Sequence, residues 1–348
     1  MTAFAQATDI AALASIEFLT SVVGEVRDVT RAPMHSIGFS GTRFERLRVV
    51  MADGYTRSLV LKHIDPRQDL TVRRSGGVSG REARVLGERA LDPIWDVFEA
   101  PYLAYAVEGD VSAVLMHDLA EHLLPDVREP LAAHQEEALV RRLAMMHARF
   151  WESSARALPW LARAEFVYGF LAPGELAVEE TRGPLPTVMV AARQGWTLAQ
   201  RMLPPAVTRL VTSPPADLSG VTAGLPRSIL HGDTKVANFA LLPHGRVAAF
   251  DWAIVCEGCP TIDIGWYVAV NASRLTRSKE AVFGLYRSAL QEHLGRTLTD
   301  AMWGRMYDAA VLGGAMVLLW NKALNVQKGV AGASEEWDWW VAQLERLA

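Results

Sequence analysis

The sequence predicts an α+β protein with two lobes, one over residues 1–118 and one over residues 119–348. The chain of 348 residues exceeds the usual size of a single hydrophobic core, and 50% of its residues are hydrophobic, enough to fill two. The amino-terminal third contains β-type apolar runs such as Leu59 to Ile64, whereas the remainder has mainly helical periodicity. These observations predict a small lobe built on a sheet and a larger, mainly helical lobe.

Composition and charge exclude several classes of function. The formal net charge is −4 and no block of Lys or Arg stands out, so a nucleic-acid partner is not expected. The apolar run Val311 to Trp320 is too short to span a bilayer, and the start resembles no secretory signal because Asp9 follows only a short Ala-rich stretch. We expect a cytoplasmic protein with no membrane partner; the oligomeric state stays open.

A hairpin is predicted in the middle of the chain. Pro243-His244-Gly245 is a bend signal between the apolar runs Phe239 to Leu242 and Val247 to Phe250. Asn238 precedes the first run and Asp251 follows the second, so the two side chains are expected at adjacent strand ends.

The residues around this hairpin suit phosphoryl transfer. Asp233 follows the strand-like Ile229-Leu230 and could orient an acceptor hydroxyl and take its proton. We expect two neighbouring strand ends to carry Asp233, Lys235, Asn238 and Asp251. The amide oxygen of Asn238 and the carboxylate of Asp251 offer hard ligands for Mg²⁺. The transition state of this reaction is rich in charge, so the protein mainly positions the acceptor and neutralises charge.

At His231, Gly232, Asp233 and Asn238 the chain resembles the aminoglycoside phosphotransferase and choline kinase group. The resemblance implies a two-lobed protein-kinase-like fold, with a small antiparallel-sheet N-lobe, a larger mainly helical C-lobe, and ATP and Mg²⁺ as cofactors. It implies that Asp233 is the catalytic base and that Asn238 and Asp251 bind Mg²⁺. These side chains would meet the nucleotide in the cleft joining the lobes.

Two further positions bear on the resemblance. Asp263 follows a Gly-Cys-Pro turn, and in the family this carboxylate braces the backbone of the catalytic loop. At the position of Lys235 the group often has His, whereas many protein kinases have Lys there, as this chain does. The lysine could reach the γ-phosphate.

The amino-terminal lobe offers the other half of a nucleotide site. By the resemblance, Lys62 at the end of its strand holds the α- and β-phosphates. The helical pattern that begins near Arg81 makes Glu82 the candidate partner of this lysine, with Glu88 as runner-up. The alternative is that Lys62 and Glu82 are unrelated surface charges.

Two loops complete the predicted nucleotide site. Ile37 to Thr42 could fold over the phosphates through backbone N–H groups and a hydroxyl, although an ordinary hairpin turn is about equally probable. The phosphate-binding candidates in it are Ser40, Gly41 and Thr42. Ser112 to Leu119 resembles the family's interlobe linker, whose backbone, here Met116 to Leu119, meets adenine. The same segment could be an edge strand ending in a turn.

The carboxy-terminal lobe contains several features that we interpret as structural. Glu136 to Phe150 has helical periodicity, and His147 on its apolar face is interpreted as a hydrogen-bonded core histidine. Cys256 and Cys259 make only half a zinc site, so packing is favoured over a metal or redox role. Three late tryptophans are interpreted as packing, with a stacking role left open: Trp337, Trp339 and Trp340.

Substrate choice is expected in Glu152 to Leu225 and the late helices. Acidic and basic residues balance there, and five aromatic residues add apolar surface: Trp160, Phe166, Tyr168, Phe170 and Trp196. A neutral or partly apolar alcohol is therefore favoured over a polycation, and choline-like acceptors stay possible.

The sequence leads to one main hypothesis, an ATP-dependent phosphotransferase that acts on a hydroxyl of a small molecule. A catalytically silent nucleotide-binding pseudokinase or adaptor is the alternative, and a protein kinase is a third option. The acceptor and the choice between ATP and GTP stay open.

Overall fold

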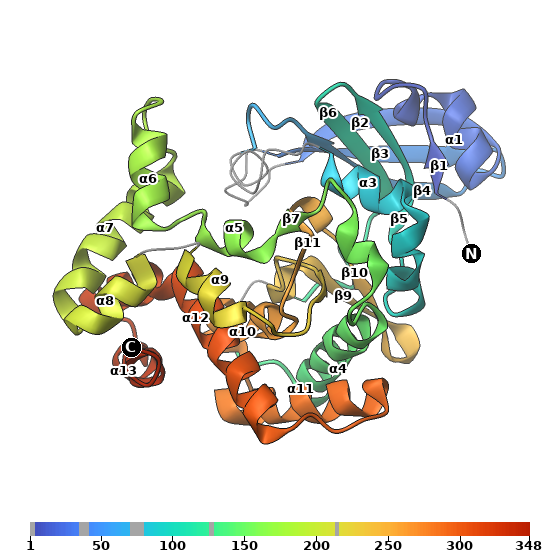
Figure 1. Cartoon of the computed structure of the whole chain (residues 1–348). Helices are drawn as coiled ribbons and strands as arrows, with labels where there is room; N and C mark the ends of the chain where they lie inside the picture. Colours follow the sequence, from blue (N-terminus) through green and yellow to red (C-terminus); the bar gives the residue numbers. More distant parts are fainter. Residues whose placement is uncertain (1–3, 35–41, 70–79, 125–128, 213–215) are drawn as a thin grey trace. The chain divides into compact units, whose positions relative to one another are not determined.

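The computed structural model describes residues 4–34, 42–69, 80–124, 129–212 and 216–348 (Figure 1). Contacts divide the chain into two compact units. Unit 1 comprises Met1–Pro125 and Ala237–Val255, and unit 2 comprises Asp126–Val236 and Cys256–Ala348. The α+β class is confirmed, because unit 1 is built on a sheet and unit 2 is mainly helical. The lobe boundary at 118/119 stays a prediction.

Unit 1 contains a six-stranded sheet of order β1-β5-β6-β4-β3-β2. The strands are β1 Ala5–Gln6, β2 Val26–Met34, β3 Arg43–Met51, β4 Thr56–Ile64, β5 Tyr102–Glu108 and β6 Val111–His117. The five long strands pair antiparallel as predicted, but the short β1 runs parallel to β5, so the sheet is mixed.

Local sequence explains how the strands of unit 1 connect and pack. Between β3 and β4 the Asp53 side chain accepts from the Tyr55 N–H, and Gly54 has φ 86°, which glycine adopts without strain. Alternate residues of β3 and β4, Leu47 and Leu59 among them, are fully buried in one apolar core. Helix α1 (Ile16–Val23) contributes Leu19 and Val23 to that core.

The rest of unit 1 supplies the helix and hairpin that surround the end of β4. The bounds are η1 Ala12–Ala14, α3 Arg81–Gly87, η2 Arg89–Asp96, β9 Phe239–Leu242, η5 Pro243–Gly245, β10 Arg246–Ala249 and η6 Trp252–Ile254. The predicted hairpin is confirmed: β9 and β10 pair antiparallel with Ala240 opposite Ala248, and the bend places His244 and Gly245 at φ 64° and 71°.

Unit 2 is a helical assembly around a small three-stranded sheet of order β7-β11-β8. Its strands are β7 Ala162–Arg163, β8 Ser228–Leu230 and β11 Cys256–Gly258. Its long helices are α4 Ala133–Arg149, α7 Thr187–Met202, α10 Thr261–Val270, α11 Lys279–Leu294, α12 Asp300–Gln327 and α13 Ala333–Glu345. Shorter ones are η3 Ser154–Ala157, α5 Ala164–Gly169, α6 Pro173–Glu180, α8 Pro205–Thr212, α9 Ala216–Thr222 and η7 Ala272–Arg274; η4 Val236–Asn238 joins the units. Helix α4 confirms the predicted helix, beginning three residues earlier.

Judged by length and composition alone, helix α12 is long and apolar enough to cross a membrane. The run Val311 to Trp320, which is too short to do so, is only part of this helix. The most apolar 18-residue window of α12 has a mean hydropathy of 1.4, and 78% of that window is buried inside the protein. Such burial is typical of a core helix, and α12 packs against α7, α10 and α13.

Glycines allow the helices around α12 to approach closely. A Cβ on Gly265 of α10 would lie 2.0 Å from the Ala310 carbonyl oxygen, and one on Gly314 of α12 would lie 2.6 Å from the Gly265 carbonyl oxygen. Where α7 meets α12, a Cβ on Gly195 would lie 2.3 Å from the Trp320 carbonyl oxygen. Backbone contacts this short leave no room for a side chain, so the packing of α10 and α7 against α12 depends on these glycines.

Candidate functional site

The end of β4 holds a buried ion-pair network within unit 1. Lys62 Nζ lies 2.5 Å from Glu82 Oε2 and 2.6 Å from Asp251 Oδ1. The Lys62 side chain is 4% exposed and that of Glu82 is 0% exposed, whereas Asp251 is 32% exposed. The structure thus brings together three of the predicted residues, and the alternative that Lys62 and Glu82 are unrelated surface charges is wrong.

The charges in this network stabilise one another. Burial alone would lower the pKa of Lys62, but the charges and hydrogen bonds of Asp251 and Glu82 outweigh it and raise that pKa above its ordinary value of 10.5. Lys62 is therefore a permanent cation. The runner-up Glu88 instead caps η2, where it accepts from the Ala90 N–H.

Tyr102 at the start of β5 joins the network, and sequence reasoning missed it. Its hydroxyl donates to Glu82 Oε1 over 2.6 Å, and the Asp251 N–H lies 3.2 Å from both Glu82 Oε1 and Tyr102 Oη. Burial and the Glu82 charge raise the pKa of Tyr102 well above 10, so the hydroxyl keeps its proton. Asp251 has φ 65°, a left-handed conformation that is unusual for a residue other than glycine.

Asn238 and Asp251 lie at adjacent ends of the hairpin, as predicted. Asn238 directly precedes β9, Asp251 follows β10, and the Phe250 N–H donates to the Asn238 carbonyl oxygen. In the described part of the chain no three His, Cys, Asp or Glu side chains are grouped to hold a metal. One amide and one carboxylate nevertheless fit Mg²⁺, which takes few protein ligands and completes its shell with water and phosphate oxygens.

The predicted catalytic loop in unit 2 is braced by Asp263 of α10, which confirms the role expected for this carboxylate. Asp263 accepts from the His231 N–H at 2.7 Å and from the Gly232 N–H at 3.0 Å. It is fully buried; burial alone would raise its pKa, but hydrogen bonding and charge from His147, with smaller effects of His231 and Tyr168, hold that pKa below 3.8.

Asp233 is held at both carboxylate oxygens. The indole N–H of Trp266 donates to Oδ1 at 3.1 Å, and Lys235 Nζ lies 2.8 Å from Oδ2. The side chains of Asp233 and Lys235 are 15% and 38% exposed. The two contacts fix the direction of the Asp233 carboxylate, and a fixed direction is one requirement of a general base.

One expectation about the topology is wrong. Asp233 and Lys235 follow β8, whose sheet partner is β11, whereas Asn238 and Asp251 flank β9 and β10. The four side chains therefore come from the ends of strands in two sheets, because the loop after β8 leaves one sheet before the chain enters the other.

The segment predicted to meet adenine lies at the end of β6. This strand is central in the sheet, between β5 and β4, so the edge-strand alternative is wrong. The N–H groups of His117 and Asp118 donate to Pro101 and Ser58 within unit 1, and a turn at Leu119 follows instead of the expected helix. The proposed contacts of Met116 and Leu119 with adenine stay predictions.

Of the predicted phosphate loop, Ser40 and Gly41 lie outside the described residues. Thr42 is described and buried, and its hydroxyl donates to Asp69 at 2.8 Å. This bond ties the start of β3 to the segment after β4.

The features interpreted as structural are buried in unit 2. His147 is fully buried between the Tyr286 hydroxyl at Nδ1 and Asp263 at Nε2, which confirms the core-histidine interpretation. Both cysteines are buried thiols, and burial raises the pKa of Cys259 to about 11. Trp337 and Trp340 are buried as predicted, whereas Trp339 packs against Lys279, 4.8 Å from its ring centroid.

Among the described residues of 152–225, most of the aromatic side chains expected to form an acceptor surface are not exposed. Trp160, Tyr168 and Trp196 are buried in the core, and Phe166, 50% exposed, is the clear exception. Sequence pattern could not separate these cases because core and surface aromatics share the same spacing. The aromatic part of the argument for a neutral or partly apolar acceptor is therefore weakened, whereas the argument from balanced charges is unchanged, and the preference stays a prediction.

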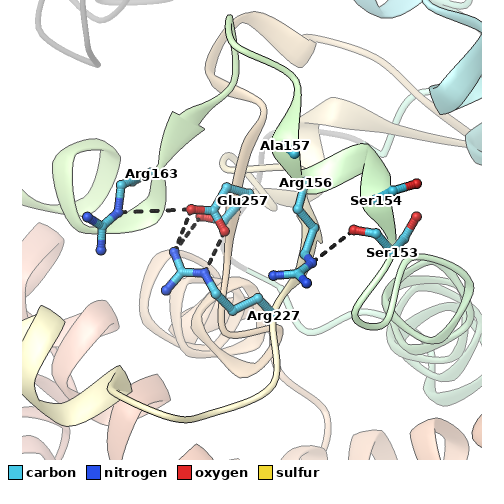
Figure 2. A pocket seen from close by; sticks show the side chains of 7 residues that line it. All are labelled: Ser153, Ser154, Arg156, Ala157, Arg163, Arg227 and Glu257. Atoms are coloured by element: carbon cyan, nitrogen blue, oxygen red, sulfur yellow. Dashed lines mark hydrogen bonds and ion pairs between the residues drawn. The ribbon is translucent and has the colours of Figure 1, made fainter.

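A hollow of about 420 Å³ in unit 2 is no candidate for the acceptor site (Figure 2). Figure 2 shows Arg163 and Arg227 directed at Glu257. Arg227 bonds to the carboxylates of Glu257 and the buried Glu165 through all its guanidinium nitrogens. Arg227 also precedes β8, whereas the catalytic loop follows it. The hollow is thus lined by arginine donors already committed to carboxylates.

Two residues that sequence reasoning missed, one in α10 and one at its C-cap, support the predicted catalytic loop. Asn271 accepts from the Val236 N–H and donates to the Thr234 carbonyl oxygen, and Trp266 bonds to Asp233. Both follow Asp263 at helical spacing, so extending the helix forward from Asp263 would have found them.

The family model described as "Phosphotransferase enzyme family" matches residues 40–309. A search of curated proteins found no match.

Two solved structures show the same fold, and a third has a lower similarity. A spectinomycin phosphotransferase in complex with ADP and spectinomycin is 10% identical, with a TM-score of 0.52 and coverage of 95% of this chain and 92% of that one. A choline kinase from Cryptosporidium parvum Iowa II is 11% identical, with a TM-score of 0.50 and 95% of each chain covered. An aminoglycoside phosphotransferase from Alicyclobacillus acidocaldarius subsp. acidocaldarius DSM 446 is 13% identical, with a TM-score of 0.48 and coverage of 94% and 95%. The fold is therefore protein-kinase-like. The family model matches more than half of this chain, which shows that the chain belongs to the phosphotransferase enzyme family.

Proposed function

We propose that this protein is a small-molecule kinase that transfers the γ-phosphoryl group of Mg·ATP to a hydroxyl group. The observation that carries the proposal is the buried contact of Lys62 with Glu82 and Asp251, which joins residues 189 positions apart at the predicted nucleotide site. The solved spectinomycin phosphotransferase with bound ADP supports a nucleotide as cosubstrate.

Each residue then has a defined task. Lys62 neutralises the nucleotide phosphates, and Glu82 fixes the position of its ammonium group. Asn238 and Asp251 would hold Mg²⁺, which when bound shields phosphate charge and orients the phosphates.

The acceptor side of the reaction depends on Asp233. Trp266 and Lys235 fix its carboxylate, which orients the acceptor hydroxyl and takes its proton as the O–P bond forms and the bond to ADP breaks. Lys235 would neutralise charge on the transferring phosphoryl group; its contact of 2.8 Å with the Asp233 carboxylate supports a place beside the reacting groups. Met116 and Leu119 would supply backbone contacts to adenine, and Thr42, directly before β3, would contact the phosphates.

A panel of alcohols, including metabolites and antibiotics, tests the proposal through consumption of Mg·ATP. The Asp233→Ala variant should turn over an accepted alcohol about 10²–10⁴-fold more slowly while its nucleotide affinity changes little. Asp300→Ala is the control, because this carboxylate is 95% exposed. Unchanged turnover in Asp233→Ala would contradict the assignment of Asp233 as the base. No phosphorylated product from any alcohol would count against the proposal as a whole and favour the catalytically silent alternative.

A further inference from the structure

We propose that Tyr102 is a positioning residue for Asp251: its hydroxyl holds the backbone of Asp251 in the one conformation from which the carboxylate can serve a nucleotide-bound divalent cation. This inference rests on the proposed function and concerns the same site. All of the contacts that carry it lie within unit 1.

The first observation is the backbone of Asp251. At φ 65° it occupies the left-handed region, which costs free energy for a residue with a side chain and persists only where surrounding contacts enforce it. Strain of this kind at a candidate metal ligand needs a structural cause.

The second observation supplies the cause. The Asp251 N–H is directed at Tyr102 Oη and Glu82 Oε1, each at 3.2 Å, and Tyr102 Oη is itself bonded to Glu82 at 2.6 Å. Lys62 holds the other end of Asp251, 2.6 Å from Oδ1. With both its amide and its carboxylate fixed, Asp251 has little freedom to rotate.

The third observation is that Tyr102 cannot move away. It is 4% exposed and packs edge-on against Trp95, with ring centroids 5.7 Å apart. Trp95 in turn packs against Trp252, the residue after Asp251, at 6.0 Å. The same aromatic cluster therefore supports the tyrosine and the strained segment that it bonds.

The hydroxyl has a specific chemical role in this arrangement. It donates its proton to Glu82 and uses an oxygen lone pair to accept from Asp251, so it links the lysine partner to the metal ligand. Phenylalanine keeps the ring packing and removes both bonds. Loss of this support is expected to give the Asp251 carboxylate more freedom to move. Binding of the cation should therefore weaken more than binding of the nucleotide.

The test compares wild type with Tyr102→Phe by calorimetric titration of Mg²⁺ into protein saturated with ADP, and of ADP in the presence of EDTA. We expect Mg²⁺ to bind about 10–100-fold more weakly to the variant, the usual effect of losing a partner of a metal ligand. Metal-free ADP affinity should change little, because Lys62 and Glu82 keep their contact. Tyr105→Phe is the matched control, since this hydroxyl lies on the same strand and bonds only weakly to Gln6 at 3.3 Å.

The outcomes are distinguishable. Wild type that binds Mg·ADP and a Tyr102→Phe variant with the same Mg²⁺ affinity would overturn this inference alone. Wild type that binds no Mg·ADP would overturn the proposed function and this inference with it. Melting followed by circular dichroism checks that the variant folds. If the variant does not fold, hydrogen exchange of the Asp251 amide in wild type tests the inference instead. The inference requires this N–H to be protected, and an unprotected N–H would contradict it.

Discussion

At the residue scale, the Lys62 ammonium compensates the charges of two carboxylates, one of them fully buried. Lys62→Met would leave Glu82 as an uncompensated buried charge, which costs about 3–5 kcal/mol when one partner of a buried pair is removed. We expect urea unfolding to show this loss and ADP affinity to fall as well. The double variant Lys62→Met, Glu82→Gln should recover part of the stability but none of the affinity. Equal stability of the two variants would contradict the assignment.

Trp266 allows a second test at the residue scale. Trp266→Phe keeps an aromatic ring and removes the hydrogen bond to the Asp233 carboxylate, a bond to a charged group worth about 1.5–3 kcal/mol. We expect kcat to fall roughly 10-fold or more with nucleotide affinity unchanged. Trp339→Phe serves as the control. It removes an indole hydrogen bond from α13 to Glu280 of α11, a bond that does not involve α10. If both variants behaved alike, Trp266 would have no special role at Asp233.

At the element scale, the packing of α10 against α12 determines where Asp263 and Trp266 lie. A Cβ at Gly314 would meet the Gly265 carbonyl oxygen at 2.6 Å and the Trp340 ring at 2.8 Å, so the helices must separate. Gly314→Ala is expected to destabilise the protein by about 1–3 kcal/mol.

Gly304 in the same helix is the matched control. A Cβ there meets nothing within 4 Å, so Gly304→Ala should raise stability by about 0.5–1 kcal/mol through helix propensity. Thermal melting of the two variants measures both effects. A Gly314→Ala variant as stable as wild type would show that the helix crossing is not constrained by backbone contact.

The elements also show what sequence could and could not predict. Runs with a clear period and bend residues predicted β4, the β9–β10 hairpin and α4, and the pairing of Lys62 with Glu82 followed from the resemblance. Tyr102 was missed because nothing in a strand pattern shows that its hydroxyl meets residues 20 and 149 positions away. The aromatic residues of 152–225 were misjudged because burial depends on tertiary packing.

At the scale of the whole molecule, buried carboxylates predict how stability depends on pH. Burial alone would raise the pKa of Glu165, but hydrogen bonds and the charges of Arg227 and Arg163 outweigh it and hold that pKa below 4.5. Asp263 and Glu336 likewise have lowered pKa values. A depressed pKa contributes stability above the unfolded value and loses it as the pH falls toward the folded one.

We therefore expect the free energy of unfolding to fall as the pH drops below about 4.5, where the unfolded chain binds more protons. Glu165→Gln should reduce this dependence, and Glu180→Gln, at an exposed position on α6, should not. Urea unfolding between pH 7 and pH 3 measures the slopes. Identical slopes for wild type and Glu165→Gln would show that Glu165 is not responsible.

The central claim for the whole molecule is that its polar side chains serve a magnesium nucleotide. A crystal structure with Mg²⁺ and a non-hydrolysable ATP analogue tests it most directly. We expect oxygens of Asn238 and Asp251 about 2.0–2.1 Å from Mg²⁺, with Lys62 Nζ at the phosphates and the Asp233 carboxylate facing the γ-phosphoryl group. A nucleotide bound elsewhere, or a metal ion that neither Asn238 nor Asp251 contacts, would contradict it.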